Sequence, residues 1–179
     1  EDGIVLGKYF FENRSRVNYN EIPDNLINAF ISTEDVRFRN HSGIDGRALL
    51  RAIYGALSGK TSSGGASTIT QQLSKMLFTE KPSSGIERVM QKLKEWIISG
   101  QLEKRYTKDE ILTMYLNRFD WVNNAVGIKS ASQVYFNKTP IDLNVLESAM
   151  LVGMLKNPSY YNPNRRIELT KGRRNIVLS

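Results

Sequence analysis

The residues best suited to chemistry lie in a short segment that contains the chain's only histidine. Glu34 and Asp35 end an apolar helical stretch and are followed by Phe38, His41 and Gly43. An aromatic ring and an imidazole give a carboxylate a low-dielectric wall and a hydrogen-bonding partner, and these conditions tune it for acid or base work. The alternative is structural, with both carboxylates solvating a helix end while His41 caps a turn.

A second segment is dense in hydroxyls and amides and has no acidic residue. It reads Ser-Thr-Ile-Thr-Gln-Gln-Leu-Ser-Lys over residues 67–75, after a Gly- and Ser-rich loop at 60–66. Thr68 and Gln71 have the spacing of a capping box, so a helix should begin here and present free backbone amides. Free amides, hydroxyls and Lys75 together describe a receptor for an anion or a sugar. An ordinary capped helix is the alternative.

A third candidate is the pair formed by Lys92 and Glu95, with Gln91 beside it. The two charged residues lie three apart in a long stretch, about 85–105, whose apolar periodicity predicts a helix. A surface ion pair is the simplest interpretation of this spacing.

Composition limits the chemistry that these residues can do. The chain has 179 residues, no cysteine and one histidine. The length suits one domain with a hydrophobic core, and the composition excludes disulfides, a thiol nucleophile and the usual zinc sites. Carboxylate, hydroxyl, lysine or tyrosine chemistry remains, and oxygen ligands suit a hard cation such as magnesium.

The charge balance predicts an anionic partner. The 25 Lys and Arg exceed the 18 Asp and Glu and give a net charge of +7, which fits nucleic acid, anionic lipid or a phosphorylated substrate. No segment reaches the roughly eighteen apolar residues that a membrane-spanning helix needs. Because the chain starts and stops abruptly, we expect a piece of a longer protein, with an anchor or second domain outside it.

The elements that must position these residues are mostly helical. Pro23 opens a helix that ends close to Glu34, and a second helix is expected from Asp45 to Gly59. That second helix is either part of the core or a membrane-facing element, since basic residues flank its apolar surface. Residues 4–19 are the exception and predict a short hairpin. Later helices are expected after Thr107, near 126–136 and near 142–155.

Taken in order, these segments resemble the five motifs of the family 51 glycosyltransferases. This is the peptidoglycan glycosyltransferase domain of class A penicillin-binding proteins and monofunctional transglycosylases. The first motif is matched by Glu34-Asp35, Phe38, His41, Gly43 and Asp45, and the second by Gly65, Ser67 to Gln72 and Lys75. The third is matched by Lys92 and Glu95, the fourth by Ile111-Leu112 and Tyr115 to Asn117, and the fifth by Arg173-Arg174 and Val177-Leu178.

Five positions depart from the family pattern. The chain has Met76 where asparagine is common, Thr113 where glutamate is frequent, and Val122 and Asn124 where glycine is usual. The fifth is Gln91, which stands where the family usually has arginine.

The departure at Gln91 bears on phosphate binding. A guanidinium is a bidentate phosphate donor, so its loss should weaken contact with a pyrophosphate unless Lys92, Lys75 or Arg105 compensates.

The resemblance implies a mainly α fold. Its large lobe would be lysozyme-like, and a smaller, membrane-associated jaw lobe would occupy about residues 45–66 within a single domain spanning 1–179. The resemblance also implies a longer protein with an N-terminal membrane anchor and, in the class A proteins, a transpeptidase domain after this one. The domain would lie on the outer, periplasmic face of the bacterial inner (cytoplasmic) membrane.

The implied activity is polymerisation of lipid II into β-1,4-linked glycan with release of undecaprenyl pyrophosphate. Glu34 would be the general base that deprotonates the attacking sugar hydroxyl. Since an α-linked donor gives a β-linked product, the displacement inverts and needs no carboxylate nucleophile. Glu95 would help to position the pyrophosphate through Lys92 or a divalent cation, Mg or Mn, while Lys75 and Arg173 neutralise its charge.

The remaining motif residues are expected to bind or shape the substrate site. Thr68, Gln71 and Gln72 would hold the sugars, and His41 would orient the loop that carries Glu34. The other residues expected there are Asp35, Phe38, Gly65, Ser67 and Asn117. The expected partners are lipid II, the growing glycan strand and the bacterial cytoplasmic membrane, with moenomycin as an inhibitor and no role for nucleic acid.

Two other functions compete with this one. A lysozyme-like muramidase would use a protonated Glu34 as an acid, but it has no need for lysines aimed at a pyrophosphate. A non-catalytic basic module that binds anionic lipid or nucleic acid would need only the net charge and the apolar second helix.

Overall fold

The computed structural model describes residues 16–57, 67–78 and 84–179, and the regular secondary structure in these ranges is almost entirely helical. The single strand pairing within them is an isolated bridge between Asp120 and Val126. The mainly α fold class is therefore confirmed. The α-helices are α1 (Asp24–Glu34), α2 (Gly46–Leu57), α3 (Ile69–Phe78), α4 (Gly85–Arg105), α5 (Lys108–Arg118), α6 (Ile128–Phe136), α7 (Val145–Leu155) and α8 (Ile167–Leu178).

Most of the predicted hairpin at 4–19 lies outside the described residues. Its described end contains no strand: Val17 is in irregular structure, and Tyr19–Glu21 form a short 3₁₀ helix. Val17 is buried, so its apolar character serves the core rather than a strand. The prediction is wrong for this end of the segment.

Local capping explains where several helices begin. The side chains of Thr107 and Glu110 bond to each other's backbone amides and so form the predicted capping box at the start of α5. At the start of α4, Ser84 accepts from the backbone amide of Glu87. None of the described helices is long and apolar enough to span a membrane.

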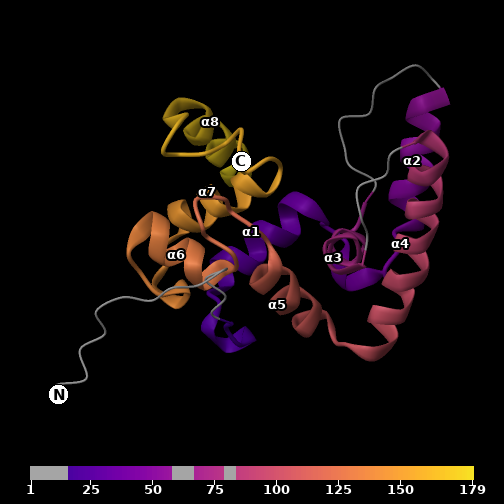
Figure 1. Cartoon of the computed structure of the whole chain (residues 1–179), viewed down its shortest axis with the longest axis horizontal. Helices are drawn as coiled ribbons and strands as arrows, with labels where there is room; N and C mark the ends of the chain where they lie inside the picture. Colours follow the sequence, from indigo (N-terminus) through magenta and orange to yellow (C-terminus); the bar gives the residue numbers. More distant parts are fainter. Residues whose placement is uncertain (1–15, 58–66, 79–83) are drawn as a thin grey trace.

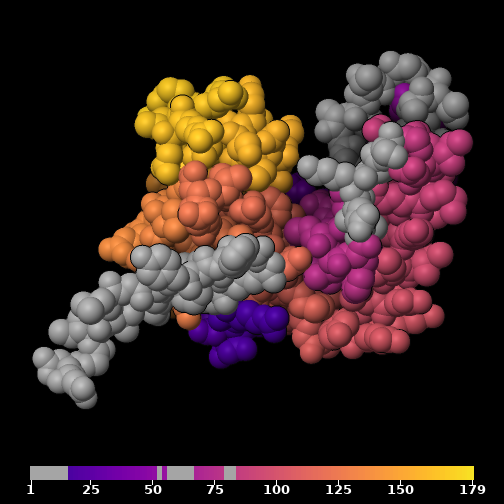
Figure 2. All heavy atoms as spheres, viewed as in Figure 1, coloured from indigo at the N-terminus to yellow at the C-terminus, as the bar shows by residue number. Residues whose placement is uncertain are grey.

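The helices form a large body and an arm, and the arm consists of α2 and the N-terminal half of α4 (Figure 1). In the large body α1 packs against α7, and α7 packs against α8. Helix α3 joins the two parts because it contacts both α5 and α4. In Figure 1, α2 and the N-terminal half of α4 extend away from α6, α7 and α8. Figure 2 shows a hollow between the α8 end of the large body and this arm.

The core of the large body is made of fully buried apolar side chains from distant parts of the chain. Phe30 of α1, Tyr115 of α5 and Trp121 are among the largest of them. Their rings pack in series with Phe119, at centroid separations of 4.7 Å, 5.8 Å and 4.9 Å. This packing fixes α1 against α5 and so sets the position at which α1 ends.

The loop from Asp120 to Val126 keeps a left-handed backbone without the usual glycines. Val122, Asn123 and Asn124 have φ angles of 59°, 52° and 62°. Asparagine tolerates this region, but a β-branched valine there is strained. The turn is closed by the amide of Trp121, which donates to the carbonyl of Ala125 at 2.9 Å.

Candidate active site

Glu34 is the last residue of α1, as predicted, and its side chain is half-buried. The buried face of the helix, made by Leu26, Ile27 and Phe30, anchors this end in the core. Among the described residues, one side-chain hydrogen bond reaches the Glu34 carboxylate, from Nε2 of Gln72 to Oε2 at 2.9 Å. The carboxylate lines two cavities of about 660 and 170 Å³. It is therefore open to a ligand while a neutral amide orients it.

Asp35, the next residue, points into the protein. Its carboxylate accepts from the backbone amide of Ile69 at 3.1 Å and contacts Nε2 of His41 at 3.0 Å. The sequence predicts free amides at the start of α3 for a ligand anion, but Asp35 already occupies this end of the helix. His41 and the helix N-terminus thus hold the segment that carries Glu34.

The loop after His41 is fixed by a glycine that no other residue could replace without movement. Gly43 has a φ of 88°, and a Cβ there would lie 2.9 Å from the backbone carbon of Ser99 on α4. Its carbonyl accepts from Oγ1 of Thr68 at 2.7 Å and from Nε2 of Gln71 at 3.3 Å. Thr68 and Gln71, which were expected to hold sugars, are buried and use these donors on the protein's own backbone, and each of them also lines a cavity of the site.

The first-motif carboxylate at Asp45 starts α2. It accepts from the side chain of Arg37 and from the amides of Arg47 and Ala48. The hydrogen bond from Arg37 lowers the pKa of Asp45 to about 2, with further help from the two amides, although burial opposes the shift. Asp45 is therefore a helix cap held ionised by an arginine.

Glu95 of α4 lies in a contrasting environment. It is 5% exposed, and both of its oxygens accept hydrogen bonds from its own helix. Nε2 of Gln91 donates to Oε1 at 3.0 Å, and Nζ of Lys92 donates to Oε2 at 2.9 Å. Lys92 also donates to Oγ of Ser67 at 2.8 Å. The predicted ion pair therefore forms, but only its lysine lies at the surface: the carboxylate is buried, and the ammonium is held between Glu95 and Ser67.

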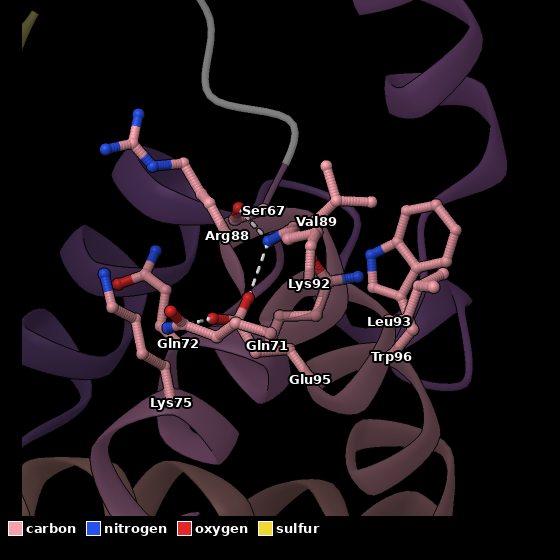
Figure 3. A pocket seen from close by; sticks show the side chains of 11 residues that line it. Ser67, Gln71, Gln72, Lys75, Arg88, Val89, Lys92, Leu93, Glu95 and Trp96 are labelled. Carbon is pink, nitrogen blue, oxygen red and sulfur yellow. Dashed lines mark hydrogen bonds and ion pairs between the residues drawn. The ribbon is translucent and has the colours of Figure 1, made fainter. Parts of the chain in front are cut away.

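The Lys92–Glu95 pair faces a cavity of about 860 Å³ (Figure 3). Gln72 and Lys75 of α3 lie on one side of it, while Leu93 and Trp96 of α4 lie on the other. The cavity therefore has a polar side and an apolar side.

The two carboxylates belong to one cleft. Ser67 and Gln72 line both the Glu95 cavity and the larger Glu34 cavity, so the two hollows share a wall. On the Glu34 side the cleft is completed by Arg173 of α8, whose Nε is buried without a partner among the described residues.

Two predicted site residues do not reach the cleft. Phe38 is fully buried, with the ammonium of Lys108 4.3 Å from its ring centroid. Asn117 uses both ends of its amide on the backbone of Val17, at 2.9 Å each. These residues brace the fold instead of contacting a ligand. Gly65 lies outside the described residues.

Sequence reasoning gave no role at the cleft to two residues, Arg88 and Tyr115. Arg88 lies one helical turn before Lys92 and lines the same cavity, and this four-residue spacing could have identified it. Arg105, expected to compensate for Gln91, lies at the other end of α4 and does not line this cavity. Tyr115 reaches the cleft indirectly, since its hydroxyl donates to Oε1 of Gln72 at 2.9 Å.

The residues around Glu95 do not form a ready cation site. Across the described ranges, no group of three or more His, Cys, Asp or Glu side chains is placed to hold a metal ion. Glu95 is a single carboxylate whose two oxygens already accept from Gln91 and Lys92. The lysine ammonium supplies positive charge where Mg or Mn was expected. The cation therefore stays a prediction, and the roles proposed below use only the chain's own residues.

Comparison with protein families identifies the class. The family model described as transglycosylase matches residues 2–179. The chain therefore belongs to the transglycosylase family, which confirms the resemblance and the enzyme class of peptidoglycan glycosyltransferase that it implied.

Named relatives agree with this class. The chain is 40% identical over 178 residues to penicillin-binding protein 1A of Escherichia coli K12 and, over the same length, 40% identical to penicillin-binding protein 1F of Bacillus subtilis 168. It is 44% identical over 166 residues to penicillin-binding protein 1A of Clostridium tetani. These matches cover 99%, 99% and 90% of this chain but only 20%, 24% and 20% of the relatives. The chain thus spans between a fifth and a quarter of their length.

Proposed function

We propose that this domain polymerises lipid II into β-1,4-linked glycan and releases undecaprenyl pyrophosphate. The observation that carries the proposal is a single cleft with two carboxylates in different environments. Glu34 is open and accepts from the neutral amide of Gln72, whereas Glu95 is buried and paired with Lys92. Inverting transfer from a pyrophosphate needs a base on one side and fixed positive charge on the other.

Glu34 acts as the general base in this proposal. The acceptor sugar's hydroxyl oxygen bonds to the donor's anomeric carbon as the bond from that carbon to the pyrophosphate oxygen breaks. The hydroxyl proton passes to Glu34, and the negative charge leaves with the pyrophosphate. Attack and departure occur on opposite faces of the sugar, so the configuration inverts and no second carboxylate attacks carbon.

The basic residues of the Glu95 cavity receive the leaving group. Lys92 is held between Ser67 and Glu95, so its ammonium needs little rearrangement when charge develops. Lys75 and Arg88 line the same cavity and add positive charge, and Arg88 supplies a guanidinium that Gln91 lacks. The opposite side, with Leu93 and Trp96, suits the start of the lipid chain.

Ser67 and Gln72 line both cavities and are therefore placed to contact the sugars at the point of transfer. Arg173 supports the same end of the cleft, where its Nε, which has no partner in the described part of the chain, offers a donor. We assign the growing strand and the incoming lipid II to the two sides of this shared wall.

The arm is proposed to lie at the outer face of the bacterial cytoplasmic membrane. Along α4, exposed apolar side chains recur at helical spacing over three turns. They are Ile86, Val89, Met90, Leu93 and Ile97, and Leu50 and Tyr54 of α2 are exposed as well. Apolar residues with basic neighbours such as Arg51 and Lys94 suit an anionic lipid surface. We also propose that the domain belongs to a longer, anchored protein, with a transpeptidase domain after it.

A gel assay with labelled lipid II in detergent tests the function. The domain should produce a ladder of glycan strands, moenomycin should block it, and Glu34→Gln should abolish it. Glu168→Gln, which changes an exposed carboxylate of α8, should leave it intact. EDTA followed by Mg or Mn tests the expected cation.

Two results would overturn the proposal. Shortening of finished strands with lipid II left unused would indicate a muramidase. Binding to anionic vesicles without turnover, unchanged in Glu34→Gln, would indicate a binding module.

A further inference from the structure

A buried tyrosine is linked to the open carboxylate of the cleft through one glutamine. Tyr115 of α5 is 1% exposed, and its hydroxyl donates to Oε1 of Gln72 at 2.9 Å. The other end of the same amide, Nε2, donates to Oε2 of Glu34 at 2.9 Å. The three side chains come from three helices, α5, α3 and α1, so the link exists only in the folded protein.

The direction of this link follows from the chemistry of its members. An ionised carboxylate can only accept hydrogen bonds, while a side-chain amide has a donating and an accepting end. If the amide of Gln72 were turned over, its oxygen would face the Glu34 carboxylate and two acceptors would oppose each other. In the observed orientation the hydroxyl of Tyr115 donates to Oε1, so the accepting end of the amide has a fixed partner while its donating end faces Glu34.

Tyr115 is well suited to act as a fixed donor. Its ring is packed between Phe30 and Phe119, at centroid separations of 4.7 Å and 5.8 Å. Burial, with a smaller effect from the charge of Glu34, raises the pKa of the Tyr115 hydroxyl far above its ordinary value. The phenol therefore keeps its proton throughout the pH range in which the enzyme works.

We propose that Tyr115 is a positioning residue for the transfer reaction. It holds the amide of Gln72 with its N–H toward Glu34, and the hydrogen bond that the amide donates keeps the Glu34 carboxylate correctly aimed. The inference rests on the proposed function, in which Glu34 is the base. Tyr115 itself is buried and does not touch the substrate.

Tyr115→Phe removes the hydroxyl and keeps the ring. In the lipid II assay we expect kcat to fall about tenfold, with KM within about twofold, because the hydrogen bond that orients Gln72 toward the base is lost while the substrate contacts remain. Gln72→Met leaves the tyrosine in place, removes the hydrogen bond to Glu34 and should lower kcat at least as much.

The matched control is Tyr135→Phe. That hydroxyl donates to the carbonyl of Trp121 at 2.7 Å, in the loop region away from the cleft. It should leave kcat and KM unchanged even if it lowers stability. A double variant completes the test: Tyr115→Phe should have no further effect on kcat in the Gln72→Met background, because the two residues act in series.

The outcomes separate this inference from the proposed function. An unchanged kcat in both Tyr115→Phe and Gln72→Met would overturn the positioning role, as would additive losses in the double variant. Wild-type protein that makes no glycan, or Glu34→Gln that makes it normally, would overturn the function itself. Should Tyr115→Phe not fold, the kcat of Gln72→Met decides alone.

Discussion

The two sides of the cleft are built in different ways. Glu95 is served by its own helix, since its hydrogen-bonding partners Gln91 and Lys92 lie four and three positions before it. Glu34 is served from a distance, since its partner Gln72 lies 38 positions away in the chain. Glu95, whose partners come from its own helix, is buried, and the ammonium of Lys92 balances its charge. The other carboxylate depends on packing between helices and remains open.

This difference shows how one cleft gives two carboxylates two tasks. A carboxylate whose charge is already balanced by a fixed ammonium is a poor proton acceptor but a good anchor for that ammonium. A carboxylate with one neutral donor and an open face can take a proton from a bound hydroxyl. Environment, rather than residue type, assigns the roles.

The largest expected effect tests this division directly. Glu34→Gln should lower kcat by about 10² to 10⁴, the usual contribution of a general base. Glu95→Gln should cost only about tenfold to a hundredfold, since Lys92 keeps its bond to Ser67 and its charge. Initial rates of lipid II polymerisation measure both. Equal losses of kcat in the two variants would contradict the different roles of Glu34 and Glu95. Full rescue of Glu95→Gln by Mg or Mn would show that the Glu95 carboxylate is not essential.

The second prediction tests whether the Glu34 side of the cleft depends on close packing between distant parts of the chain. Gly43→Ala places a methyl group 2.9 Å from the backbone of Ser99 at a positive φ, so it should destabilise the fold by about 3 kcal/mol. Urea unfolding measures the loss. The control is Gly46→Ala, because a Cβ there meets nothing within 4 Å. Similar stability in the two variants would contradict the close packing.

A smaller effect concerns the acid sensitivity of the same side. The folded pKa of Asp45, about 2, lies below its ordinary 3.8. Its stabilising contribution is therefore complete above pH 4 and disappears as the pH falls from about 4 to about 2. Asp45→Asn should cost about 1 kcal/mol at neutral pH and almost nothing at pH 2. Urea unfolding of both proteins across this range measures the difference, and a gap that stays constant would refute the ion pair with Arg37.

The smallest effect lies outside both sides of the cleft. Val122→Gly relieves a valine held at a φ of 59° and should stabilise the protein by up to about 1 kcal/mol, net of the entropy of glycine. Thermal unfolding measures it. The matched change Val126→Gly, at a position without a positive φ, should destabilise instead. Neither should alter the pH–rate profile, so a changed profile in Val122→Gly would extend the site to this loop.

Local signals in the sequence predicted much of the fold. Apolar periodicity placed α1, α2 and α4, while the capping pair of Thr107 and Glu110 located the start of α5. No bounds were predicted for α8. The spacing of Lys92 and Glu95 predicted their contact. These features involve residues one helical turn apart, so the geometry of the helix itself brings them together.

The sequence by itself determined the helical composition, the family and the two carboxylates to be considered. Only the tertiary structure decided which of the two carboxylates stays open. It also showed that Phe38 and Asn117 stabilise the fold instead of lining the cleft. It alone joined Tyr115, through Gln72, to Glu34. The physical reason is that the packing of distant helices determines which of several suitable partners lies within reach of a side chain. Local periodicity in the sequence does not specify that packing.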